Sequence, residues 1–147
     1  MPSSYETKNL LIPWVILVST VAIHIVDEIM TDFLPFYNQF VHEIRSEFGF
    51  FPLPTYSFGS WIIGVWVVVI FGYSLTPIVA RAGNLIKVVV SVIALLMFVN
   101  GMLNLLLSWY FRTWVPGATS SPLLLFASIF LLVRVWLYKR NNGDGRN

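Results

Sequence analysis

Four apolar runs, each close to the length of a membrane-spanning helix, constrain this chain more than any other feature of its sequence. An α-helix needs about 20 mostly apolar residues to cross a hydrocarbon core about 30 Å thick. The runs extend approximately over residues 10–30, 58–80, 85–110 and 122–138. Stretches rich in proline, glycine and polar residues separate them, which is typical of turns and loops. The pattern predicts an all-α, integral membrane four-helix bundle that forms a single membrane domain over residues 1–147.

Composition supports lipid as the surroundings of this chain and argues against several classes of function. Hydrophobic residues make up 57% of the 147 residues and charged residues only 11%, whereas soluble domains carry about 25% charged residues. The sequence has no cysteine, which excludes a disulfide framework, a thiolate nucleophile and an iron–sulfur cluster. The net charge is +2, and the basic residues flank the apolar runs instead of forming a patch. We therefore expect no nucleic-acid partner.

The basic residues near the ends of the runs predict an orientation in the membrane. One side carries Lys8, Arg81, Lys87, Arg134, Lys139, Arg140 and Arg146. The other side carries Arg45 and Arg112. Because basic residues accumulate on the cytoplasmic side of bacterial plasma membranes, we expect a multi-pass protein of the cell membrane with its N- and C-termini in the cytoplasm.

The segment between the first two runs predicts a further helix on the extracytoplasmic side, approximately over residues 35–48. Its large apolar residues recur at every fourth position: Phe36, Phe40, Ile44 and Phe48. Pro35 suits a first helical turn, and Gly49 suits a helix end. We expect an amphipathic helix that lies in the membrane interface or covers the bundle. A helix that packs on the bundle for stability alone is the alternative.

Ionisable residues interrupt the first run near its outer end. His24, Asp27 and Glu28 fall on one face of a helix. An ionisable group at the bilayer centre costs about 2.5 to 3.5 kcal/mol, so these side chains need partners in protein or water. Asn100 lies at a similar depth in the third run, which crosses in the same direction, and Asn104 follows one turn later. We expect these two polar faces to meet, although asparagines also serve as interhelical hydrogen-bonding residues without a further function.

Polar residues of the other runs occur at the same level. The second run opens with Ser60 and Trp61, and Thr119 precedes the fourth run, whose N-terminal dipole favours a nearby anion. We therefore expect a pocket in the outer half of the bilayer to which all four helices contribute. The candidate substrate-binding residues are Asn100, Asn104, Thr20, Ser60, Trp61 and Thr119.

The candidate catalytic residues are His24, Asp27 and Glu28. Two adjacent carboxylates in a low dielectric raise each other's proton affinity, so that one can remain protonated as an acid while His24 acts as base or relay. The same three residues are the candidate ligands if a single divalent metal binds. The sequence requires no cofactor, and the remaining histidine and acids lie in loops or tails, which excludes a di-iron site in the bundle core.

The leading hypothesis is a membrane enzyme, such as an isomerase or a hydrolase, that applies acid–base chemistry to a membrane lipid or another apolar small molecule. A lipid- or sterol-binding protein, a transport protein and a non-enzymatic accessory membrane subunit remain as alternatives. The inner halves of the runs carry almost no ionisable groups, which argues against a path through the membrane.

Three short stretches resemble a known family. They are His24-Ile-Val-Asp27-Glu28, Asn100-Gly-Met-Leu-Asn104 and Val115-Pro-Gly-Ala-Thr119. Together they resemble the HXXEE domain family of small four-span bacterial membrane proteins, named for a His-x-x-Glu-Glu motif, over most of the chain. Asp27 replaces the first glutamate, and Asn104 stands where a histidine is expected, which weakens a metal site. The resemblance implies a four-span membrane fold and no particular activity. By fold-level analogy alone, such a bundle also resembles sterol isomerases and sterol-binding proteins.

Overall fold

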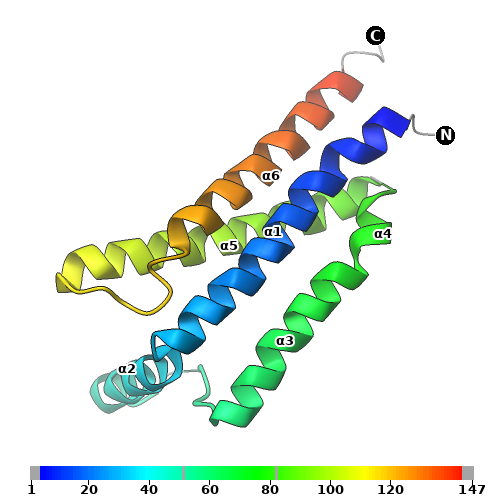
Figure 1. The fold of residues 1–147 in the computed structure, drawn as a ribbon. Coiled ribbons are helices and arrows are strands. Elements are labelled where there is room, and N and C mark those ends of the chain that lie inside the picture. The colour runs from blue at the N-terminus through cyan, green and yellow to red at the C-terminus, as the bar shows by residue number, and fades with distance from the viewer. Residues whose placement is uncertain (1–3, 51, 82, 144–147) are drawn as a thin grey trace.

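The computed structural model describes the backbone of residues 4–50, 52–81 and 83–143 and the side chains of residues 10–50, 52–81 and 83–137. Within these ranges the elements are helices and no strand occurs, so the predicted all-α class is confirmed. The helices are α1 (Ser4–Met30), α2 (Phe33–Phe48), α3 (Phe58–Ser74), α4 (Thr76–Val79), α5 (Asn84–Phe111) and α6 (Ser121–Gly143) (Figure 1). Four residues of the predicted charge pattern, Lys8, Lys139, Arg140 and Arg146, have side chains outside the described residues.

Three segments of the described chain are long and apolar enough to cross a membrane. They are Leu10–Met30, Phe58–Val79 and Asn84–Phe111, and the apolar part of α6, Ser121–Leu137, is shorter. Large apolar side chains cover the outer faces of these helices; Ile63 is 66% exposed and Leu85 is 75% exposed. Apolar surface on this scale suits contact with lipid tails better than contact with water. The fold is therefore compatible with a multi-pass membrane protein.

The second predicted span, over residues 58–80, consists of two helices instead of one. α3 ends at Ser74, and α4 begins at Thr76. Pro77 explains the break, because proline has no backbone N–H to donate to the carbonyl one turn earlier and its ring crowds that carbonyl. Leu75 between the two helices keeps a helical backbone, with φ −74° and ψ −13°, so the disturbance is local.

α1 occupies the centre of the bundle and is the most buried of the three long apolar segments. α6 runs along one side of α1, α3 lies on its other side, and α5 packs mainly on α6. Figure 1 shows α2 at one end of the bundle and α4 at the other, with the start of α1 and the end of α6 near α4. We refer to these as the α2 end and the α4 end.

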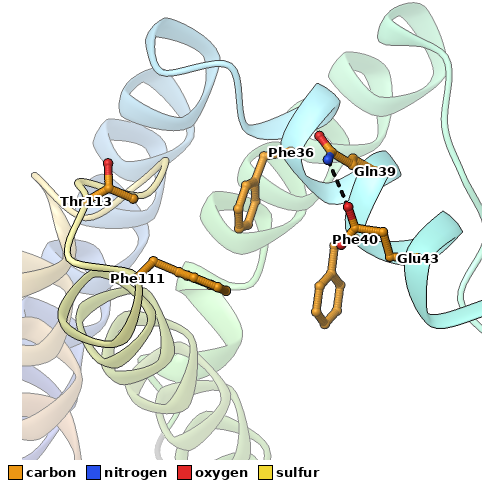
Figure 2. A pocket seen from close by; sticks show the side chains of 6 residues that line it. All are labelled: Phe36, Gln39, Phe40, Glu43, Phe111 and Thr113. Carbon is orange, nitrogen blue, oxygen red and sulfur yellow. Dashed lines mark hydrogen bonds between the residues drawn. The ribbon is translucent and has the colours of Figure 1, made fainter. Parts of the chain in front are cut away.

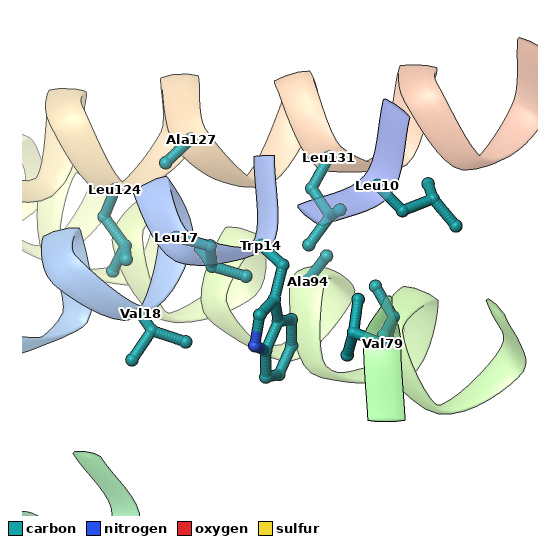
Figure 3. Packing of buried hydrophobic residues seen from close by; sticks show 10 residues of the cluster. Leu10, Trp14, Leu17, Val18, Val79, Ala94, Leu124, Ala127 and Leu131 are labelled. Atoms are coloured by element: carbon teal, nitrogen blue, oxygen red, sulfur yellow. The ribbon is translucent and has the colours of Figure 1, made fainter. Parts of the chain in front are cut away.

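The main apolar core lies between α1, α4, α5 and α6 (Figure 3). Its buried residues are Leu10, Trp14, Leu17, Val18, Val79, Val90, Ala94, Leu124, Ala127 and Leu131. Small residues allow α5 and α6 to approach closely, as is typical of helix pairs in membranes. Ala94 and Ala127 are fully buried, and a Cβ added at Gly101 would lie 3.3 Å from the carbonyl oxygen of Ser121.

α2 is helical over nearly the predicted range and ends as predicted at Gly49, which has φ 73° and donates its N–H to the carbonyl of Arg45. The buried residues of α2 are Leu34 and Val41. They do not belong to the predicted stripe of Phe36, Phe40, Ile44 and Phe48. Phe48 of that stripe is 75% exposed. Residues seven apart stay on one face of a helix, whereas a spacing of four drifts around it by about 40° at each step.

Hydrogen bonds tie α2 to the segment that precedes α3. The side chain of Asn38 accepts from the N–H of Tyr56 and donates to its carbonyl, at 3.0 and 2.9 Å. The hydroxyl of Tyr37 donates to the carbonyl of Pro54 at 3.0 Å. Burial, together with the nearby Tyr56 hydroxyl, raises the pKa of Tyr37 above its ordinary value. The Phe33 ring stacks on Trp61, with centroids 6.0 Å apart.

Candidate functional site

His24 on α1 is the centre of a buried polar cluster that joins three helices. Its side chain is 3% exposed. The Nδ1 atom lies 2.7 Å from the Oγ of Ser120, next to the start of α6. The Nε2 atom lies 3.2 Å from the amide nitrogen of Asn100 and 3.5 Å from that of Asn104, both on α5. The polar faces predicted from the sequence for α1 and α5 therefore do meet.

Glu28 follows His24 by one turn of α1 and approaches the same ring nitrogen. Its Oε1 atom is 3.3 Å from Nε2 of His24. Glu28 is 7% exposed and Asn104 is also 7% exposed, whereas Asn100 is half-buried. The cluster is thus closed around Nε2, with Asn100 at its more accessible edge.

Asp27 lies at the N-terminus of α6. One carboxylate oxygen, Oδ2, accepts from the backbone N–H of Ser120 at 2.9 Å and from its hydroxyl at 2.7 Å. α6 begins at Ser121, so this is the end of the helix where the backbone N–H groups and the dipole favour a negative charge. The anion that the sequence predicts beside the fourth run is Asp27.

The hydroxyl of Ser120 links the two side chains in a defined direction. A serine hydroxyl has a single proton, and a charged carboxylate oxygen is a stronger acceptor than a neutral imidazole nitrogen. The hydroxyl therefore donates to Asp27, and Nδ1 of His24 carries a proton and donates to the Ser120 oxygen. The resulting chain of hydrogen bonds runs from His24 through Ser120 to Asp27.

Two arrangements of protons satisfy the other nitrogen, Nε2. In the first, Nε2 is unprotonated, and its single lone pair accepts from one of the three donors around it, which are a protonated Glu28 and the amides of Asn100 and Asn104. In the second, Nε2 donates to an ionised Glu28, and the amides turn their oxygens towards the imidazolium. The two arrangements differ by the transfer of one proton across the 3.3 Å contact between His24 and Glu28 and by the orientation of the two amides.

The loop between α5 and α6 closes the cluster. Gly117 in this loop has φ 79°, and a Cβ added there would lie 2.8 Å from Asn104 Nδ2, 3.0 Å from His24 Cε1 and 3.2 Å from Glu28 Cγ. The N–H of Gly117 donates to the hydroxyl of Thr31 at 3.2 Å. Glycine is thus required both for its backbone conformation and for the space that its hydrogen leaves.

The remaining predicted substrate-binding residues lie outside this hydrogen-bonded cluster. Thr20 is buried one turn before His24. Ser60 bonds Ser57, which is the N-cap of α3 and accepts the backbone N–H of Ser60, and Trp61 is buried against Phe33. Thr119 is exposed and accepts from the indole N–H of Trp114 at 2.9 Å.

Ser120 is the cluster residue that sequence reasoning did not select as a site residue. The sequence indicated Ser120 only as one of three consecutive hydroxyl residues, with Thr119 and Ser121, that can cap the N-terminus of α6. The orientation of the loop decides among them, because Gly117 turns the chain so that Ser120 faces α1 while Thr119 faces outwards.

The three candidate metal ligands do not converge on one point. Asp27 contacts the Nδ1 side of His24 through Ser120, and Glu28 contacts the Nε2 side. In the part of the chain that the structure describes, no group of three His, Asp or Glu side chains is arranged to hold a metal ion.

A separate pocket of about 380 Å³ lies between α2 and the end of α5 (Figure 2). Its lining residues are Phe36, Gln39, Phe40, Glu43, Phe111 and Thr113. Phe36 and Phe40 belong to the predicted apolar stripe of α2, and Figure 2 shows their rings beside Phe111. The first two residues of the stripe therefore line an open pocket.

We predict that Gly117→Ala destabilises the fold more than Gly49→Ala does. Both positions have a positive φ, which costs about 1 to 2 kcal/mol for a residue with a Cβ. A Cβ at Gly49 meets nothing within 4 Å, whereas a Cβ at Gly117 displaces His24, Glu28 or Asn104. Overpacking of this kind adds about 1 to 3 kcal/mol.

Denaturant unfolding of the two variants in detergent micelles measures this difference. An equal loss of unfolding free energy for Gly117→Ala and Gly49→Ala would show that the loop does not close tightly on His24.

No protein-family model, no curated protein and no solved structure matches this chain. The chemistry of the cluster therefore has to be argued from its own geometry.

Proposed function

We propose that this chain is a membrane-embedded enzyme that moves protons within a lipid or another apolar substrate, with His24 and Glu28 as the exchanging pair. The observation that carries the proposal is the 3.3 Å contact between Nε2 of His24 and Oε1 of Glu28, while Nδ1 is committed through Ser120 to Asp27. Acid–base pairs of this kind contribute about 100-fold to 10,000-fold to reaction rates.

The pair supports a reaction that returns the enzyme to its starting state. Unprotonated Nε2 of His24 takes a proton from the substrate, and protonated Glu28 gives one to another position of the same molecule. The imidazolium then returns its proton to Glu28 across their contact. Proton gain and loss balance, so an isomerisation needs no co-reactant, whereas a hydrolysis also needs water.

Asp27 acts on this pair as a positioning residue. Its carboxylate holds the Ser120 hydroxyl, which in turn fixes the protonated state of Nδ1 and leaves Nε2 as the nitrogen that exchanges protons. A carboxylate linked to the far side of a histidine also stabilises the imidazolium when it forms.

Asn100 and Asn104 are the proposed substrate-orienting residues. Their amides lie at Nε2, where the substrate proton would be exchanged. Because Asn100 is half-buried while His24, Glu28 and Asn104 are buried, it is the residue on the Nε2 side that an incoming polar group would meet first.

Ser120 is better suited to a relay than to nucleophilic attack. Its contact with His24 and the contact of His24 with Glu28 follow the order of a serine hydrolase triad. The hydroxyl proton, however, is directed to Asp27 at 2.7 Å, so His24 is the donor in its bond with Ser120 and does not act there as a base.

We further propose that the chain crosses the cell membrane four times, with both termini in the cytoplasm and α2 at the outer interface. α6 extends along α1 from Ser120 beside Asp27 to Leu131 in the core, so it spans much of the same thickness. Its mostly apolar stretch Ser121–Leu137, of 17 residues, is about 25 Å long at 1.5 Å per residue. The motif of His24, Asp27 and Glu28 is the basis on which we propose membership of the HXXEE family.

The absence of cysteine from the sequence makes this topology directly measurable with single substitutions. We expect the thiol of a Glu47→Cys variant to react with a membrane-impermeant maleimide in right-side-out vesicles. The thiol of a Gly83→Cys variant should react only after permeabilisation. Both residues are exposed. The reverse pattern, or labelling of both variants from one side, contradicts the proposed orientation.

A non-enzymatic accessory or ligand-binding protein is the second candidate. The observation in its favour is that His24, Glu28, Asn104 and Ser120 are buried and hydrogen-bonded to one another. Interhelical hydrogen bonds in membranes contribute about 0.6 to 2 kcal/mol each, so the cluster can stabilise the bundle without any turnover.

Glu28→Gln separates the two candidates. The amide keeps the shape of the side chain and can donate to Nε2, but it cannot give up a proton, so we predict a loss of turnover of about 100-fold or more with the fold retained. The measurement is the total lipid profile of cells that express the wild-type chain, Glu28→Gln or the control Glu47→Gln, an exposed position on α2.

The enzyme proposal predicts a lipid species whose abundance changes with the wild-type chain and with Glu47→Gln but not with Glu28→Gln. If Glu28→Gln produces the same change as the wild-type chain, Glu28 is not the acid. If the wild-type chain changes no lipid while Glu28→Gln lowers the melting temperature of the purified protein, the accessory role is favoured.

A further inference from the structure

An apolar groove of about 230 Å³ lies between α1, α3 and α5, on the α4 side of the polar cluster. Its lining consists of apolar residues of α1 and α5 and of the α4-end half of α3. They are Trp14, Leu17, Val18, Val21, Val68, Val69, Phe71, Gly72, Leu75, Ile93, Leu96 and Met97.

The groove exists because α3 packs on α1 and forms hydrogen bonds with it, and does not pack on α5. The indole N–H of Trp14 donates to the carbonyl of Gly72 at 3.1 Å, and a Cβ at Gly72 would lie 3.1 Å from a methyl group of Val18. The hydroxyls of Ser19 and Tyr73 lie 2.8 Å apart. α5 packs mainly on α6 instead, and Figure 1 shows α3 standing apart from it.

The groove leads to the polar cluster. On α5 its lining residues Ile93, Leu96 and Met97 are followed on the same helical face by Asn100, because residues three and four apart lie above one another. On α1 the last lining residue is Val21, one turn before His24. A molecule that fills the groove therefore has its end next to Asn100 and His24.

The size of the groove restricts its occupant. An apolar cavity of about 150 Å³ stays free of water and binds benzene. A groove that is larger than this and lined by apolar side chains suits a slender hydrocarbon.

We propose that this groove binds one hydrocarbon chain of a membrane lipid, with the end of that chain that carries polar or unsaturated groups at Asn100 and His24. The inference rests on the proposed function and names the substrate class more closely, as a lipid with a single extended chain in the reacting position. The open side between α3 and α5 lets the chain enter from the bilayer.

The test uses a fatty acid that carries a photoreactive diazirine in mid-chain, mixed into phosphatidylcholine vesicles that contain the full-length protein. Leu17 and Val18 line the groove but are only 1% and 6% exposed, so the probe reaches them only through the groove. We expect the photolabel on Leu17 or Val18, located to the residue by fragment-ion mass spectrometry, because exposed neighbours on α1 such as Ile16 and Ile23 can be labelled from the bilayer.

Two matched pairs of variants on α3 and α5 provide the controls. Val68 and Leu96 line the groove, whereas their neighbours Val67 and Leu95 do not, although all four are between 53% and 58% exposed. Val68→Trp and Leu96→Trp should each reduce labelling of Leu17 and Val18 at least fivefold. Val67→Trp and Leu95→Trp should leave it unchanged, which also shows that an added indole does not unfold the chain.

Equal labelling in both members of each pair of variants overturns the proposal. A crosslinked dimer of the wild-type chain that Val68→Trp abolishes also overturns it, because a second copy of the chain then covers the groove. Glu28→Gln distinguishes the failure of the groove from the failure of the proposed function. If the groove binds a hydrocarbon chain, the Glu28→Gln variant is fully labelled, because binding of the hydrocarbon does not need Glu28. The proposed function predicts that the same variant has lost its turnover.

Discussion

The imidazole of His24 is the interaction on which the bundle and its proposed chemistry both depend. It is a single ring on α1, yet its two nitrogens contact two further parts of the bundle, Ser120 beside the start of α6 through Nδ1 and the asparagines of α5 through Nε2. In a bilayer an unsatisfied polar group costs several kcal/mol, so this ring can be buried only if all its partners are present. The same requirement that holds the helices together fixes which nitrogen is free to exchange a proton.

The polar cluster and the apolar groove make complementary demands on a ligand. Around His24 the side chains are hydrogen-bonded and closed by the loop at Gly117, while further towards the α4 end the residues of α1 and α5 that line the groove are apolar. Asn100 lies where the two regions meet and is half-buried. An amphipathic molecule with a long tail satisfies both regions at once, which is the physical reason for favouring a lipid over a small polar substrate.

The helices and the main polar contact could be predicted from the sequence, because they depend on periodicity. The face that carries His24 and the face that carries Asn100 and Asn104 follow directly from 3.6 residues per turn and from the relative depth of the two runs. Proline at position 77 also explains in retrospect why one run forms two helices.

The predictions were less successful where tertiary structure decides. Thr119 and Ser120 are adjacent hydroxyl residues with equal capping ability, and only the loop conformation at Gly117 determines that Ser120 faces His24. Ser60 and Trp61 begin α3 at the predicted position, but they are engaged by Ser57 and Phe33. The groove could not be anticipated, since it depends on α3 leaning away from α5 and not on any sequence pattern.

The protonation state of the His24 ring is the most direct measure of the central claim. His42 is the only other histidine, so a His42→Gln variant with ¹⁵N-labelled histidine in lipid nanodiscs gives a spectrum of His24 alone. The account predicts a protonated Nδ1, because the Ser120 hydroxyl is committed to Asp27, with Nε2 as the nitrogen that exchanges protons with Glu28. A neutral ring with its proton on Nε2 and a bare Nδ1 would contradict it.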